Sequence, residues 1–382
     1  MVSNPPIKRA RPDVIILIAT LFLVSLGTVM VYSSSSIVSL ERFGDEYFFL
    51  KKQILFVIIG IVAMIVMTKI PYLLWRKTAY AGMLVSIGLL SLLLVPGFGV
   101  KVGGATRWLR VCGFSFQVAE LVKVALVVFL AHYLAKKKEH IREFLRIFPV
   151  PLFLTFAMVC LIMLQPDFGT AVIIVILLMF MFYLAGSRIF HLAGLVAACI
   201  PVAVTLVICE SYRIQRLLSF RNPWEDPTRS GFQIIQSFIS FGSGGAFGVG
   251  LGDSMQKLFY LPEPHTDFIL SVIAEEIGFI GVAVVILLFS LLIIRGFMIS
   301  FNTPELFGTL LSAGLTIIIA LEAFINMAAV MGLVPTKGLA LPFLSYGGTS
   351  MIMSMTAVGI LLNISSYHNP DTKSGIFEAF DK

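Results

Sequence analysis

Apolar runs long enough to cross a membrane recur along this chain and restrict what it can fold into. They start at Val14 and continue to Leu362, with Lys and Arg concentrated between them. A hydrocarbon core takes about 20 helical residues per crossing, and only helices or closed barrels satisfy the backbone there. Of the 382 residues, 58% are hydrophobic and 13% charged, far from the composition of soluble domains. We predict an all-α polytopic membrane protein.

The runs predict about ten transmembrane helices in a single integral membrane domain over residues 1–382, with short tails at about 1–13 and 367–382. The expected helices cover residues 14–34, 53–70, 78–97, 117–135, 147–164, 170–186, 189–209, 268–294, 306–330 and 346–366. One large connection, at about residues 210–267, joins the seventh helix to the eighth. Connections of that length are usually functional, so the chemistry is expected there.

The distribution of basic residues predicts the orientation of the chain. Loops that stay in the cytoplasm carry an excess of Lys and Arg, and the stretch from Lys136 to Arg146 is rich in both. This pattern places both termini in the cytoplasm and the 210–267 loop outside. The net charge of +7 then follows from topology. The sequence shows no basic face with interleaved aromatic residues, the pattern that would indicate binding of nucleic acid.

Two stretches of the outer loop have recognisable patterns. Residues 231–241 separate apolar from polar positions at helical spacing, which predicts an amphipathic helix at the membrane interface. Gly242 to Gly252 contains six glycines, but no strand precedes it as in nucleotide-binding loops, so we predict a flexible turn. The four cysteines form no metal-binding pattern, and no cofactor motif is evident.

Glu120 and Lys123 interrupt the fourth apolar run with a pair of charges. A spacing of three residues puts them on one helical face, where each can neutralise the other. Ionisable residues inside a membrane segment pair with one another or mark a functional site. A structural ion pair and a site for a polar headgroup are both compatible with this pattern.

Further candidates lie at the outer ends of the helices. Asp167 lies where the fifth helix turns into the sixth, and Asp267 opens the eighth, close to Glu263 and His265. Either aspartate could simply cap a helix, because a carboxylate accepts hydrogen bonds from the first backbone N–H groups. Around Asp267, however, an acid, a base and cations for an anionic ligand could converge. The cationic candidates of the loop are Arg213, Arg216, Arg221 and Lys257.

Taken together, several motifs resemble the SEDS family of bacterial membrane proteins. They are Gly-Ala-Thr-Arg-Trp-Leu at 104–109, Gly-Leu-Gly-Asp-Ser-Met-Gln-Lys at 250–257, Tyr-Leu-Pro-Glu at 260–263, Pro-Thr-Lys-Gly-Leu at 335–339 and Ser-Tyr-Gly-Gly at 345–348. The match covers nearly the whole chain and is closer to the division members than to the elongation members. It implies an inner-membrane glycosyltransferase that joins lipid II units on the outer face.

The resemblance also implies partners and residue roles. It implies work at the division septum with a class B penicillin-binding protein and other divisome proteins, among membrane lipids. The family's essential aspartate falls on Asp267, and its paired intramembrane charges fall on Glu120 and Lys123. Arg107 and Asp167 also match family positions.

In the reaction that the resemblance implies, a sugar hydroxyl attacks and undecaprenyl pyrophosphate leaves. The hydroxyl needs a general base and the leaving group needs positive charge. Asp267 is the expected base. Arg107, Arg213 and Arg216 are expected to bind substrate together with Glu120, Lys123, Asp167, Glu263 and His265, and a divalent cation could assist.

Two other functions remain open from the sequence. A lipid II flippase could use the buried Glu120 and Lys123 pair to carry a polar headgroup across the bilayer. A non-catalytic scaffold could recruit and activate a separate synthase.

Overall fold

The computed structural model describes residues 11–102, 105–111, 114–228, 231–255, 265–336 and 338–367. Within this part of the chain, seven helices are long and apolar enough to cross a membrane. They are α1 (Val14–Phe43), α2 (Phe48–Lys69), α4 (Val118–Lys136), α8 (Ile189–Ile208), α12 (Gly278–Asn302), α13 (Leu306–Val330) and α14 (Gly348–Ser365). The predicted fold class, a helical polytopic membrane protein, is therefore confirmed.

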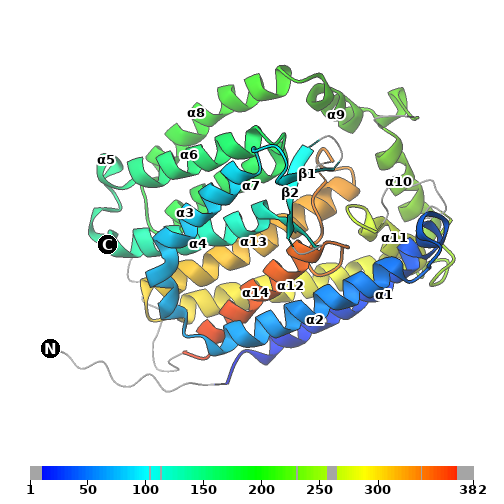
Figure 1. Cartoon of the computed structure of the whole chain (residues 1–382), viewed down its shortest axis with the longest axis horizontal. Helices are drawn as coiled ribbons and strands as arrows, with labels where there is room; N and C mark the ends of the chain where they lie inside the picture. Colours follow the sequence, from blue (N-terminus) through cyan, green and yellow to red (C-terminus); the bar gives the residue numbers. More distant parts are fainter. Residues whose placement is uncertain are drawn as a thin grey trace.

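The remaining predicted crossings also contain helices. These are α3 (Trp75–Leu92), α6 (Pro149–Met163) and α7 (Phe168–Leu184), of which α6 and α7 are apolar but shorter. Short helices α5 (Phe144–Ile147), α9 (Ser211–Arg221), α10 (Phe232–Gly244) and α11 (Ile269–Glu276) complete the set used below. The long helices lie side by side, with α9, α10 and α11 gathered toward one end of the bundle and α5 at the other (Figure 1).

A small antiparallel sheet between α3 and α4 was not predicted. Its strands, in the order β1 (Gly99–Val102), β2 (Ala105–Val111) and β3 (Phe114–Gln117), pair Gly99 with Leu109 and Trp108 with Gln117. These strands are too short to register in a search for apolar runs of spanning length. The Gln117 N–H donates to Thr349 Oγ1 over 3.0 Å, which fastens the last strand to the start of α14.

Helices α4, α13 and α14 form the interior of the bundle, and α8 lies at its surface. Nearly every residue of α14 is buried, whereas Leu192 alone is buried in α8. Small residues allow the closest approach between helices: a Cβ on Gly359 would lie 2.5 Å from the Met64 carbonyl oxygen of α2. Such contacts replace the hydrophobic effect as the source of helix association in lipid.

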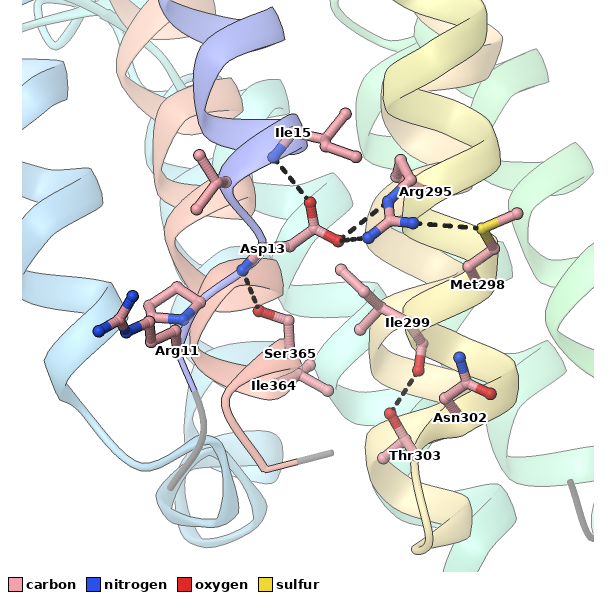
Figure 2. Close-up of a pocket in the computed structure, with 12 residues that line it drawn as sticks. Arg11, Asp13, Ile15, Arg295, Met298, Ile299, Asn302, Thr303, Ile364 and Ser365 are labelled. Atoms are coloured by element: carbon pink, nitrogen blue, oxygen red, sulfur yellow. Dashed lines mark hydrogen bonds and ion pairs between the residues drawn. The ribbon is translucent and has the colours of Figure 1, made fainter. Parts of the chain in front are cut away.

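The start of α1 is tied to two other helices (Figure 2). Asp13 caps α1 by accepting from the N–H groups of Ile15 and Ile16, and its carboxylate pairs with Arg295 of α12. The Asp13 N–H donates to Ser365 Oγ at the end of α14 over 3.0 Å. A pocket of about 430 Å³ lies beside these contacts.

The eighth predicted helix is divided into α11 and α12 by Gly278, whose φ is +76°. A helix break leaves carbonyl and N–H groups without intrahelical partners. Here Val249 and Gly250 donate to the carbonyls of Glu275 and Glu276, and the first N–H groups of α12, from Phe279 and Ile280, donate to Gly245 and Ala246. The prediction of a merely flexible glycine-rich turn was wrong, because these four bonds hold residues 245–250 against the break.

Helix α10 is amphipathic as predicted, but its small polar residues face protein. Ser237 is fully buried, bonded to Ser271 of α11 and to the Val330 carbonyl of α13. Gly244 at its end presses on the backbone of α11, where a Cβ would lie 1.9 Å from the Ala274 carbonyl oxygen. The α10–α11 contact therefore requires glycine at this position.

We expect Gly244→Ala to destabilise the protein by roughly 1–3 kcal/mol, because the added methyl group forces α10 away from α11. Thermal unfolding in detergent measures the effect. Gly242→Ala is the matched control, since the same helix has open space around Gly242 and alanine favours helix. Equal unfolding temperatures for the two variants would contradict the proposed close contact.

Candidate active site

Lys123 is the centre of a buried cluster of charges. Its ammonium group lies 2.8 Å from Glu120 Oε1 and also forms an ion pair with Glu322 of α13. The Lys123 side chain is 1% exposed and that of Glu322 4% exposed. A buried cation of this kind is tolerated only when anionic partners compensate its lost hydration. The expected pair is thus a cluster of three, which joins α4 to α13.

Glu322 was missed in the sequence, although the signal was present. It interrupts the apolar run of residues 306–330 in the same way that Glu120 and Lys123 interrupt theirs. It could not be assigned as their partner, because 199 positions separate Glu322 from Lys123. Only the packing of α4 on α13 brings the three side chains together.

Asp267 lies just before α11, in a segment whose backbone is held by three donors. The carbonyl of His265 accepts from the Tyr346 N–H over 2.8 Å, and that of Thr266 accepts from the Ser345 hydroxyl. The carbonyl of Asp267 itself accepts from Asn326 Nδ2 over 2.9 Å. Three consecutive carbonyls are therefore fixed from outside the segment, while the Asp267 side chain stays partly exposed.

The Asp267 carboxylate borders a small pocket formed by α13 and the segment that follows it. Asn326, Thr336 and Gly338 are among the residues that line this pocket. A Cβ on Gly338, whose φ is +65°, would lie 3.2 Å from Asp267 Oδ2. Glycine at this position therefore serves both the turn and the close approach of the carboxylate.

The buried cluster and Asp267 belong to one region. Asn326 follows Glu322 by four residues on α13, so the two lie on one helical face about 6 Å apart along the axis. Glu322 binds Lys123, and Asn326 binds the backbone of Asp267. Asp267, Glu120 and Lys123, which were singled out in the sequence, are thereby gathered at the same end of the bundle.

Helix α9 carries three arginines, of which Arg221 at its end is exposed and the other two have different neighbours. Arg216 is exposed, and its Nη1 lies 3.5 Å from the carbonyl oxygen of Thr336, a residue that lines the Asp267 pocket. Arg213 donates to the Leu206 carbonyl over 2.6 Å and stacks on Phe168, 5.5 Å from the ring centroid. Arg216 is thus the α9 arginine that reaches the segment beside Asp267.

Arg107 and Asp167 lie together, and neither lines the Asp267 pocket. Asp167 caps α7 by accepting from the Thr170 N–H over 3.2 Å, and its Oδ2 lies 3.7 Å from Arg107 Nε. Arg107 also donates to the carbonyls of Gln165 and Pro166. The geometry therefore accounts for Asp167 as a helix cap and for Arg107 as the clamp that fixes the α6–α7 turn to β2.

His265 is buried between aromatic rings. Its ring centroid lies 4.4 Å from that of Phe49 and 5.6 Å from that of Tyr346. Burial, aided by the charge of Arg42, lowers the pKa of His265 to about 4, so the imidazole is neutral at physiological pH. This environment favours packing over the binding of an anion. Glu263, the remaining candidate, lies outside the described residues, as do Lys257 and Lys337.

Metal ligands do not gather in the described part of the chain: no group of three or more His, Cys, Asp or Glu side chains there could hold an ion. The 430 Å³ pocket of Figure 2 is lined by Arg11, Asp13, Arg295 and residues around them. It lies where α1 begins and α14 ends, opposite the end that carries Asp267. None of the candidate residues borders it.

These features define a polytopic membrane protein with a partly exposed carboxylate above a buried cluster of charges. The family model of FtsW, RodA and SpoVE, described as cell cycle protein, matches residues 13–370. The chain belongs to this family, which confirms the SEDS resemblance found in the motifs.

Individual relatives match over nearly their whole length. A probable peptidoglycan glycosyltransferase FtsW of Trichlorobacter lovleyi is 46% identical over 365 residues, covering 96% of each chain. Stage V sporulation protein E of Bacillus subtilis is 44% identical, covering 94% of this chain and 98% of its own.

Two solved structures share the fold. One belongs to a peptidoglycan synthase complex that coordinates polymerization and crosslinking; it is 28% identical, with a TM-score of 0.76 over 93% of this chain and 97% of its own. The other is the rod shape determining protein RodA of Thermus thermophilus. It is 25% identical, with a TM-score of 0.69 over 94% of this chain and 98% of its own.

We expect Lys123→Ala to lower folded yield sharply, because it leaves Glu120 and Glu322 buried without a cation. Removing one partner of a buried ion pair costs about 3–5 kcal/mol. Monodisperse protein after size-exclusion chromatography measures the yield. Lys51→Ala is the control. Lys51 Nζ lies 2.7 Å from Asp45 Oδ2, nearly the same distance as in the Lys123–Glu120 pair, but the Lys51 side chain is 68% exposed. Equal yields would show that the cluster does not hold α4 to α13.

The low pKa of His265 predicts a stability that depends on pH. An unfolded histidine binds a proton near pH 6.5 whereas the buried one resists until about pH 4. The contribution of the neutral His265 to the free energy of unfolding is therefore fully present above about pH 6.5. It is lost as the pH falls from about 6.5 to about 4, and the loss is at most roughly 3 kcal/mol. We expect His265→Phe to remove this part of the decline in thermal unfolding. Parallel pH curves for wild type and variant would contradict a buried neutral imidazole.

Proposed function

We propose that this protein is a peptidoglycan glycosyltransferase that polymerises lipid II into β-1,4 glycan strands during septal cell-wall synthesis. The observation that carries the proposal is the Asp267 carboxylate. It is partly exposed, its backbone is held by donors at three consecutive carbonyls, and it lies at the end of the bundle that carries the buried cluster. A fixed carboxylate open to one side of the membrane suits a general base acting on a substrate from that side.

In the proposed step, the 4-hydroxyl of an incoming lipid II sugar gives its proton to Asp267. The oxygen of this 4-hydroxyl forms a bond to the anomeric carbon of the growing strand, and the bond from that carbon to undecaprenyl pyrophosphate breaks. The departing pyrophosphate takes the electron pair and needs positive charge nearby. Arg216 is the best placed candidate, because its guanidinium lies at the segment that borders the Asp267 pocket.

The other candidates take supporting roles in this proposal. Glu120, Lys123 and Glu322 hold α4 and α13 in register beneath Asp267. Arg107 and Asp167 stabilise the turn between α6 and α7, and Arg213 joins α8 to α7.

We place the protein in the bacterial inner membrane at the division septum, with both termini in the cytoplasm. The stretch from Lys136 to Arg146 then faces the cytoplasm, as the excess of basic residues in inner loops requires. Asp267 lies on the outer side in this orientation. A class B penicillin-binding protein is the proposed partner, because a structural relative is part of a complex that couples polymerization to crosslinking.

A flippase and a scaffold make different demands on Asp267. Moving a headgroup across the bilayer or recruiting a synthase needs no proton acceptor before α11. The glycosyltransferase needs one in every cycle. The fate of this carboxylate therefore distinguishes the three functions.

We expect Asp267→Asn to abolish glycan synthesis by the purified protein supplied with lipid II, with a loss of roughly 100-fold or more, because asparagine cannot accept the proton. The variant should fold normally, since asparagine keeps the shape of aspartate and α11 has no side-chain cap to lose. Asp45→Asn, at a partly exposed aspartate between α1 and α2, is the control. Strand synthesis by Asp267→Asn at the wild-type rate would overturn the mechanism.

A further inference from the structure

Asn326 of α13 is almost fully buried, with 3% of its surface exposed, and it bridges two segments that are far apart in the sequence. Its Nδ2 donates to the carbonyl of Asp267 over 2.9 Å and to that of Leu339 over 2.6 Å. Both neighbours are carbonyl oxygens, which can only accept. The carboxamide must therefore present its NH₂ group to them.

This bridge ties the start of α11 to the segment that follows α13. At the start of α11 the Ser271 N–H donates to the carbonyl of Phe268. The carbonyl of Asp267, which precedes Phe268, accepts from Asn326, and Asn326 links it to the turn that carries Gly338. Because Gly338 lies against Asp267 Oδ2, the same side chain fixes both the backbone of Asp267 and the wall beside its carboxylate.

We propose that Asn326 is a positioning residue for Asp267. This inference rests on the proposed function, since it assumes that Asp267 is the base. Asn326 acts through the backbone. By bonding to both carbonyls, it fixes the backbone of Asp267 relative to that of Leu339, so that the Asp267 carboxylate keeps its orientation toward the acceptor hydroxyl. Misplacement of a catalytic group by about 1 Å can cost 100-fold in rate.

The chain offers a matched control at the other end of the bundle. Asn363 of α14 is 1% exposed, donates from Nδ2 to the Thr68 carbonyl over 2.7 Å, and accepts from the Tyr72 N–H. It is a buried asparagine that bridges backbone groups, as Asn326 does, but far from Asp267. Substitutions at Asn363 therefore report what the loss of such a bridge does to folding alone.

The experiment measures glycan synthesis from lipid II by folded, purified wild type, Asn326→Ala, Asn363→Ala and Asp267→Asn. For Asn326→Ala we expect kcat to fall about 10- to 100-fold and KM to stay within about threefold, because Asn326 orients the base without binding substrate. Asn363→Ala should lose yield but keep kcat. A kcat within twofold of wild type for folded Asn326→Ala would overturn the proposal.

Asn326→Asp adds a second readout, the pH dependence of kcat, which a purely structural role would not change. This variant also tests the proposal if Asn326→Ala does not fold. The protonated acid can still donate one hydrogen bond to a carbonyl, whereas the ionised acid donates none. We expect its kcat relative to wild type to fall as pH rises, with no such trend for folded Asn363→Asp. Matching pH profiles for the two variants would overturn the proposal.

Asp267→Asn separates this inference from the proposed function. If Asp267→Asn is inactive while both Asn326 variants have wild-type kcat, positioning by Asn326 is wrong and the proposed function stands. If Asp267→Asn polymerises normally, the proposed mechanism fails, and the positioning of that base fails with it.

Discussion

The structure around Asp267 depends on one constraint: an interrupted helix in an apolar bundle must find partners for the backbone groups that the interruption exposes. Helix α11 has only eight residues and is interrupted at both ends. At its end, residues 245–250 take up the carbonyls of Glu275 and Glu276 and the first N–H groups of α12. At its start, Tyr346, Ser345 and Asn326 take up three consecutive carbonyls.

Side chains reinforce both ends of α11. Buried Glu275 accepts from the Met255 N–H and from the Ser254 hydroxyl, while Glu276 accepts from Ser33 of α1. The glycine-rich stretch is thus bound by its backbone and by the acidic end of the helix. Asp267 inherits a fixed position because α11 cannot shift without breaking bonds at both ends. Rigid elements of this kind place catalytic groups more accurately than free loops.

The sequence predicted the parts of this arrangement that stand out against an apolar background. Glu120 and Lys123 were visible because charges are rare in spanning segments, and Glu322 obeys the same rule. Asn326 and Ser345 gave no such signal, since each acquires its role from a carbonyl 59 or 79 positions away. The glycine-rich stretch was predicted to be flexible because its hydrogen-bond partners, around the break between α11 and α12, are likewise distant in the sequence. The short strands β1 to β3 lie below the length at which apolar runs are informative.

The charges around Asp267 also give the proposed site a direction. On the α13 side lies the buried cluster, in which two carboxylates surround a single ammonium group, so that side carries no surplus of positive charge. On the α9 side, Arg216 contacts Thr336 at the edge of the pocket. In the proposed mechanism, the leaving pyrophosphate is attracted to Arg216 on the second side. In that mechanism, the donor strand, which bears the leaving group, is therefore oriented toward Arg216 of α9. This proposed polarity follows from where α4, α9 and α13 place their charges, and it sets the side of Asp267 on which the leaving group lies.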